Sequence, residues 1–128
     1  MQAEADLVAS RAAVEAFLAA ARSGDFDALL AVLDPDIVFR ADHVAVSQGA
    51  AEEIRGAVAV AQQIIGRPGW TRFVQPVLVD GTVGLVVAPH GHLALLVRLT
   101  IRDGKIVTID GIADPVHLHQ VRLAVLPG

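Results

Sequence analysis

The stretch that decides the fold is Ala21–Asp42, which reads ARSGDFDALLAVLDPDIVFRAD. Gly24 ends a first predicted helix, because glycine adopts the left-handed conformation that satisfies the last carbonyls of a helix. Asp25 then stands at the N-cap of a short second helix. The apolar residues of that helix, which recur at helical spacing, are Phe26, Leu29, Leu30 and Leu33. Pro35 ends it, because the residue before a proline avoids the α region. The run 37–42 predicts a strand.

Helices are predicted on both sides of this stretch, and a sheet is predicted after it. The first helix spans about residues 3–22 and the third about residues 50–65, each with an apolar stripe along one side. From Thr71 onward the pattern changes to runs rich in Val, Ile, Leu and Thr. The runs are 72–79, 82–88, 93–102 and 105–113. Two Asp-Gly pairs between them predict tight hairpins and therefore an antiparallel meander.

Three helices before a curved antiparallel sheet predict an α+β cone, with the helices on the concave face and one early strand at the sheet edge. Such a cone leaves room for a cavity at one end. At 128 residues, the length is that of a single domain, 1–128. Apolar residues on both faces of the strands predict a homodimer through the outer face of the sheet.

Composition excludes several classes of function. There is no cysteine, which excludes disulfides, thiolate catalysis and cysteine-bound metals. Lys and Arg number 10 against 14 Asp and Glu, giving a net charge of −4 with no basic cluster, so nucleic acid is not an expected partner. No apolar run reaches the roughly 18–20 residues of a membrane helix, and the acidic N-terminus does not resemble a secretory signal. We therefore expect a cytoplasmic protein without a membrane partner.

The order of helix, Gly-Asp turn, short helix, Asp-Pro-Asp and strand resembles the start of the nuclear transport factor 2-like superfamily, in its SnoaL-like branch. Within it, the sequence is most similar to the C-terminal SnoaL-like domain of some extracytoplasmic-function sigma factors. Those tails share the segments GDFDALL, DPD, RAD and DGKI, and a late Asp-Pro, here Asp114-Pro115. The resemblance covers about residues 10–120. One departure is 43–46, His-Val-Ala-Val, where those tails are rich in glycine.

Asp42 is the leading candidate for chemistry, because similar ketosteroid isomerases carry their general base near the end of the first strand. A carboxylate at the mouth of an apolar cavity has a raised pKa and can transfer protons near neutral pH. His43 follows it and titrates near neutral pH, which suits a proton shuttle. The alternatives are an aspartate that caps a turn or pairs with Arg40, and an exposed loop histidine.

The expected cavity walls are predicted to shape an apolar substrate. They are Phe17, Phe39, Val58, Trp70, Val97, Leu99 and Ile109. By resemblance, Val97 and Gly111 stand where the isomerase and epoxide-hydrolase branches keep catalytic acids, and neither is an acid here. The absence of tyrosine excludes an oxyanion hole built on a tyrosine hydroxyl. Arg98 and Asp110, charged residues inside apolar strands, are expected to pair on the convex face.

Two histidine pairs, His90 with His92 and His117 with His119, lack a third ligand nearby, so we expect no metal and no cofactor. Two functions stay open. The first is a cofactor-independent isomerase, cyclase or epoxide-opening enzyme that acts on an apolar, polyketide-like compound, with Asp42 as the acid/base. The second is a non-catalytic domain, related to the sigma-factor tails, that senses a ligand or binds a protein partner.

Overall fold

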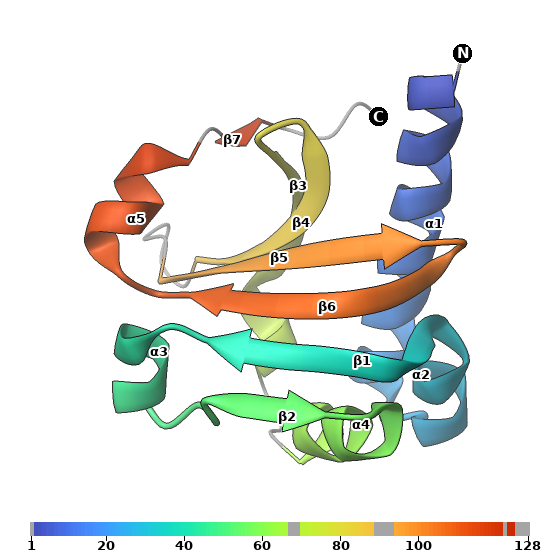
Figure 1. The fold of residues 1–128 in the computed structure, drawn as a ribbon, viewed down its shortest axis with the longest axis horizontal. Coiled ribbons are helices and arrows are strands. Elements are labelled where there is room, and N and C mark those ends of the chain that lie inside the picture. Colours follow the sequence, from blue (N-terminus) through green and yellow to red (C-terminus); the bar gives the residue numbers. More distant parts are fainter. Residues whose placement is uncertain (1, 67–69, 89–93, 122, 125–128) are drawn as a thin grey trace.

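The computed structural model describes residues 2–66, 70–88, 94–121 and 123–124, which form a curved seven-stranded sheet with helices packed on it (Figure 1). The strand order is β2-β1-β6-β5-β4-β3-β7. At its centre lies the predicted antiparallel meander. Its strands are β3 (Val74–Val79), β4 (Thr82–Val87), β5 (Leu95–Arg102) and β6 (Lys105–Ile112). The α+β cone predicted from the sequence is therefore confirmed.

Both predicted Asp-Gly hairpins are present, and their backbone explains the residue choice. Asp80 and Gly81 have φ of 50° and 89°, and Asp103 and Gly104 have φ of 54° and 76°. Two consecutive residues with positive φ give the turn whose twist matches that of the flanking strands. These turns fix the register of β3 against β4 and of β5 against β6.

The early strand lies inside the sheet and not at its edge. β1 (Leu33–Ala41) runs parallel to β6 on one side and antiparallel to β2 (Glu53–Arg55) on the other. The far edge is formed by β7 (Leu123–Ala124), which pairs with β3.

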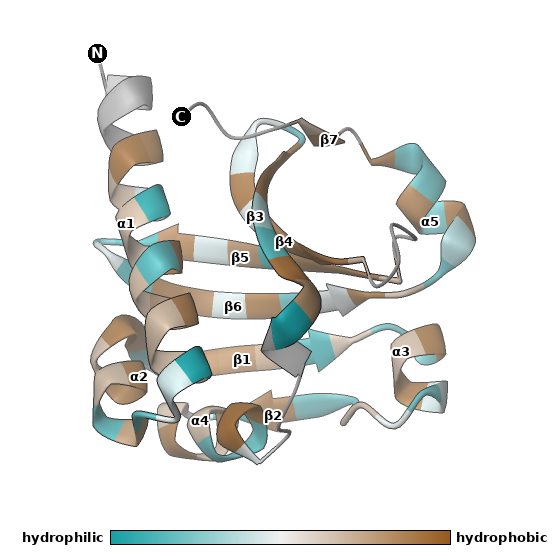
Figure 2. Cartoon of the chain, turned by 180° about the vertical axis from the view of Figure 1, so that it is seen from behind, coloured by the Kyte–Doolittle hydropathy of each residue, from teal (hydrophilic) through white to brown (hydrophobic). Residues whose placement is uncertain are grey.

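Three helices cover one face of the sheet, as Figure 2 shows from behind. They are α1 (Gln2–Ser23), α2 (Phe26–Val32) and α4 (Ala57–Ile65). Asp25 caps α2 as predicted, with its carboxylate accepting from the Ala28 amide at 3.0 Å. Phe17, Leu29 and Val60 bring the three helices into the core against Leu85 and Ile106. Within the described residues, no helix has the length and apolarity needed to cross a membrane.

The third predicted helix begins later than expected. Residues 53–55 form β2 because they pair with β1, and α4 starts only at Ala57, after Gly56 with a φ of 92°. A further helix, α3 (His43–Ser47), occupies the segment directly after β1. Neither change alters the topology, but both change which residues can reach the cavity.

The outer face of the sheet is partly covered by the chain itself. After β6, α5 (Pro115–Gln120) packs over one end of this face. Leu118 and Val121 contact a small second cluster, made of Val79, Val86, Leu96 and Ile112. This part of the outer face therefore needs no partner chain to cover it. The predicted homodimer stays a prediction.

Candidate functional site

An apolar cavity of about 130 Å³ lies between the helices and the inner face of the sheet. The described residues that line it are Phe17, Phe39, Ala50, Ala51, Gln63, Ile64, Leu85, Val97 and Ile109. The strand register explains why four of these residues lie together on the sheet side of the cavity. Leu85 stands opposite Val97, and Phe39 stands opposite Ile109. Side chains directly opposite on neighbouring strands share one face of the sheet. α1 and α4 close the cavity from above with Phe17, Gln63 and Ile64.

The chemical character of this cavity is uniform. Gln63 is the one polar side chain among the described lining residues, and none of these residues titrates. Gln63 makes no side-chain hydrogen bond with another described residue. General acid/base catalysis needs a titratable group within hydrogen-bond reach of the substrate. The described lining offers no such group.

Asp42 lies elsewhere, at the junction of β1, α3 and the end of β6. One of its carboxylate oxygens accepts from the Ala45 amide at 2.8 Å, which caps α3. The other accepts from the amides of Ala113 and Asp114, at 2.9 Å and 3.0 Å. The side chain therefore joins two segments that are about 70 residues apart, and it does not line the apolar cavity. The sequence analysis left open that Asp42 caps a turn, and the observed hydrogen bonds agree with that alternative.

The pKa of Asp42 is shifted in the direction opposite to the prediction. Partial burial raises the pKa of this carboxyl, but the three backbone hydrogen bonds and the neighbouring His43 lower it more, so it lies below its ordinary value of 3.8. Hydrogen bonds donated to a carboxylate favour its charged form. The predicted raised pKa at a cavity mouth is wrong, because the carboxylate faces amides instead of apolar walls. A catalytic role for Asp42 stays a prediction without support from this geometry.

Comparison with known proteins agrees with this fold. No family model matches the sequence. The chain is 32% identical over 110 residues to the ECF RNA polymerase sigma factor SigJ of Mycobacterium tuberculosis, covering 77% of this chain and 35% of SigJ. The crystal structure of SigJ matches with a TM-score of 0.66 at 31% identity, over 84% of this chain and 42% of that one. The chain thus spans about a third of the curated relative's length.

Two further solved structures share the fold. An NTF-2 like protein of unknown function from Burkholderia xenovorans LB400 is 19% identical with a TM-score of 0.56, over 94% of this chain and 86% of that one. A candidate polyketide cyclase from Sinorhizobium meliloti, protein SMa1630, is 26% identical with a TM-score of 0.54, over 77% and 92%. The chain therefore has the fold of NTF-2 like proteins and is similar in sequence to part of the sigma factor SigJ.

The predicted cavity walls divide into four groups. Phe17, Phe39, Val97 and Ile109 line the cavity. Leu99 is buried in the core beside it without lining it. Val58 is a correction, since 53% of it is exposed to solvent. Because residues two apart in a helix point about 200° apart, Val58 faces away when Val60 is buried. The side chain of Trp70 lies outside the described residues.

Five lining residues were missed by the sequence interpretation. They are Ala50, Ala51, Gln63, Ile64 and Leu85. Sequence periodicity could have assigned two of them to the cavity side. Ile64 follows the buried Val60 by four residues on a helix, and Leu85 lies at an inward position of the alternating strand β4. Ala50 and Ala51 lie in the loop between α3 and β2, whereas the sequence pattern assigned them to the start of the third helix. The polar Gln63 had no reason to be assigned to an apolar wall.

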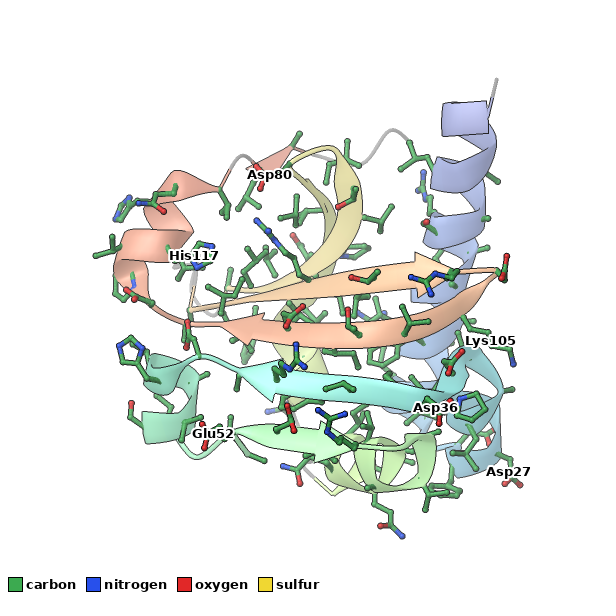
Figure 3. All side chains as sticks on the ribbon, in the orientation of Figure 1. Asp27, Asp36, Glu52, Asp80, Lys105 and His117 are labelled. Atoms are coloured by element: carbon green, nitrogen blue, oxygen red, sulfur yellow. The ribbon has the colours of Figure 1, made fainter. Side chains whose placement is uncertain are left out.

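His43 is the first residue of α3, and its side chain is exposed. This matches the exposed histidine that was the alternative to a proton shuttle. His117 and His119 lie on α5 and are also exposed, and Figure 3 labels His117 beside the sheet. His90 and His92 lie outside the described residues. Within the described residues, no three metal-ligating side chains come together, and the expectation of no metal stays a prediction.

Charged side chains gather on the outer face of the same strands. In register, Glu53, Arg40, Asp110 and Arg98 follow one another across β2, β1, β6 and β5. We call these four residues, with Asp80, the outer charged row. Arg40 pairs with Glu53 at 3.1 Å. The hydrogen bonds of Glu53 to Arg55 and to Arg40 lower the pKa of its carboxyl.

The predicted pairing of Arg98 with Asp110 is wrong. The two residues stand directly opposite each other, but the guanidinium of Arg98 extends along the face and donates to Asp80 at 2.7 Å. Gly84 stands opposite Arg98 on β4, and the space beside it is filled by the Val79 side chain and the Val97 carbonyl. Asp80 belongs to the first Asp-Gly turn, which Figure 3 shows at the far end of the sheet from β2.

Proposed function

We propose that this domain binds a small apolar molecule in the cavity and does not transform it chemically. The single observation that carries the proposal is the described cavity lining, which is apolar except for Gln63 and has no titratable side chain. Removing apolar surface from water supplies about 25 cal/mol per Å², which is enough to hold a small ligand without charged contacts.

The sizes of the cavity and of the predicted substrate also favour binding of a smaller molecule. Pockets for drug-sized ligands usually measure about 300–1,000 Å³. The cavity measures about 130 Å³, so a polyketide-like compound exceeds it. The similarity to part of a sigma factor supports the same choice, because that relative is named for a role in transcription and not for an isomerase or cyclase activity. We propose that ligand binding here serves sensing or contact with a protein partner.

The second candidate function is the acid/base enzyme predicted from the sequence. What favours it is the 26% identity to a candidate polyketide cyclase that matches over 92% of its length. In that case Asp42 is the acid/base and the substrate must lie near the end of β1. The low pKa of Asp42 and its three backbone hydrogen bonds weigh against this candidate.

The proposal can be tested with toluene as the ligand, with its binding detected as a rise in the thermal unfolding temperature Tm. Toluene at about ten times its Kd should raise Tm by roughly 4 °C. Val97→Phe fills the cavity and should abolish this rise. Thr100→Phe adds the same ring at an exposed position of the same strand and should preserve it. No rise in the wild-type protein would overturn the proposal. Turnover of an apolar compound that Asp42→Asn removes would establish the second candidate.

The homodimer remains a proposal with a revised basis. α5 covers part of the outer face, so a second copy would have to contact the outer charged row as well as the remaining apolar surface. Sedimentation equilibrium decides the matter. A monomer at high micromolar concentration would refute the dimer.

A further inference from the structure

We infer that the cavity ligand is a neutral, single-ring aromatic compound that carries one hydrogen-bonding group, and that Gln63 recognises this group. The inference rests on the proposed function and adds the chemical class of the ligand. It draws on the volume of the cavity, the residues that face one another across it, and the one polar side chain in the described lining.

Volume limits the number of rings. A cavity of roughly 150 Å³ with an apolar lining stays dry and accepts benzene. The cavity here, at about 130 Å³, is of that size. A single six-membered ring with one small substituent fits, whereas a fused multi-ring compound requires walls to move. Because core packing resists such movement, size selects against larger ligands.

The arrangement of the lining favours an aromatic ring over an aliphatic chain. Phe17 approaches from α1, and Phe39 approaches from β1 on the floor. Aromatic rings attract one another in edge-to-face and offset geometries beyond the effect of area burial alone. Val97 and Ile109 complete the floor with branched side chains that pack against a flat ring. Two phenylalanines among nine lining residues stand out, because the whole chain has only four.

The polar specificity comes from Gln63. Its carboxamide both donates and accepts hydrogen bonds, so it suits a hydroxyl or a carbonyl on the ligand. Gln63 follows the buried Val60 by three residues on α4, which turns it toward the core side of the helix. With no hydrogen bond to another described side chain or amide, its carboxamide is available for a ligand. An ionised ligand is disfavoured, because the described lining has no opposite charge and an unpaired buried charge is costly.

Methyl NMR of protein labelled at Leu, Val and Ile tests this class, with toluene, phenol and benzoate as probes. Shifts at Leu85, Val97 and Ile109 report occupancy of the cavity. Gln63→Leu should weaken phenol relative to toluene by about three- to tenfold, the effect of one net hydrogen bond. Gln62→Leu, at the exposed neighbouring position, should leave that ratio unchanged. Benzoate at pH 7 should bind at least tenfold more weakly than phenol.

The outcomes separate the two proposals. If neither toluene nor phenol shifts these methyl groups, the proposed function fails and the ligand class fails with it. If toluene binds but Gln63→Leu leaves the phenol-to-toluene ratio unchanged, only the role of Gln63 and the ligand class are overturned. Benzoate binding as tight as that of phenol overturns the neutral class, again without touching the proposed function.

Discussion

The two faces of the same strands differ in chemistry. On the inner face, Phe39, Val97 and Ile109 line a cavity without a titratable group among its described residues. The next residue on each of these strands is charged and lies on the outer face. These residues are Arg40, Arg98 and Asp110. Alternation along a strand therefore separates an apolar cavity from a charged surface, with no overlap of residues. Charged residues at the centre of a sheet can therefore lie on the face opposite its apolar cavity.

Val97→Asp would break this separation most strongly. It places a carboxyl on the inner face, where no described lining residue can pair with it, and we expect the free energy of unfolding to fall by about 3–5 kcal/mol at pH 7. Burial should raise the pKa of the new carboxyl in the folded state. The part of this penalty that comes from the charge is then absent below the unfolded pKa of about 3.9 and grows as pH rises through it, while the cost of replacing a buried valine by a neutral carboxyl remains at all pH values. Urea unfolding at pH 4 and pH 7 measures this.

The matched control is Thr100→Asp, on the same strand at an exposed position. It should change the free energy of unfolding by less than about 0.5 kcal/mol. Equal losses for the two variants would mean that the inner and outer faces do not differ in the way described here.

Asp42→Ala tests the junction of β1, α3 and the end of β6. The variant leaves three backbone amides without their acceptor, and two of these tie the end of β6 to α3. We expect a loss of about 2–3 kcal/mol in urea unfolding at pH 7. Asp25→Ala removes a cap that accepts a hydrogen bond from the Ala28 amide at an exposed position, and it should cost about 1 kcal/mol. A smaller loss for Asp42→Ala than for Asp25→Ala would show that the hydrogen bonds of Asp42 do not stabilise the fold.

The pH dependence of Asp42 has the opposite sign to that of the designed carboxyl at position 97. Its folded pKa lies below the ordinary value, so its contribution to stability is present above the unfolded pKa of about 3.9 and is lost as pH falls through the folded pKa. Wild-type protein should therefore lose more stability than Asp42→Asn between pH 4 and pH 2. Parallel stability curves for the two proteins would contradict the lowered pKa.

Local signals in the sequence predicted much of the fold. The two Asp-Gly turns and the Asp25 cap depend on a few adjacent residues, and all three are present. The start of the third helix depends on distant pairing, because residues 53–55 bond to β1, so its prediction was wrong. Strand alternation found Val97 and Ile109. It could not find Gln63, since nothing local marks a glutamine as part of an apolar wall.

The direction of the Asp42 pKa shift and the partner of Arg98 were mispredicted for the same reason. A turn cap was one of the alternatives left open for Asp42 by its position at the end of a strand, but the direction of its pKa shift depends also on the amides of residues 113 and 114. No local pattern relates those amides to residue 42. The partner of Arg98 was likewise missed, because Asp80 lies in a turn 18 residues away in the sequence.

The smallest expected effect belongs to the outer charged row. Arg98→Gln removes the ion pair with Asp80, whose side chains are 39% and 48% exposed. Exposed pairs contribute roughly 0–1 kcal/mol. We expect a change within about 0.5 kcal/mol in urea unfolding, and toluene binding equal to that of wild type. A loss above about 1.5 kcal/mol, or weakened toluene binding, would show that the outer face supports the cavity and that the two faces are not independent.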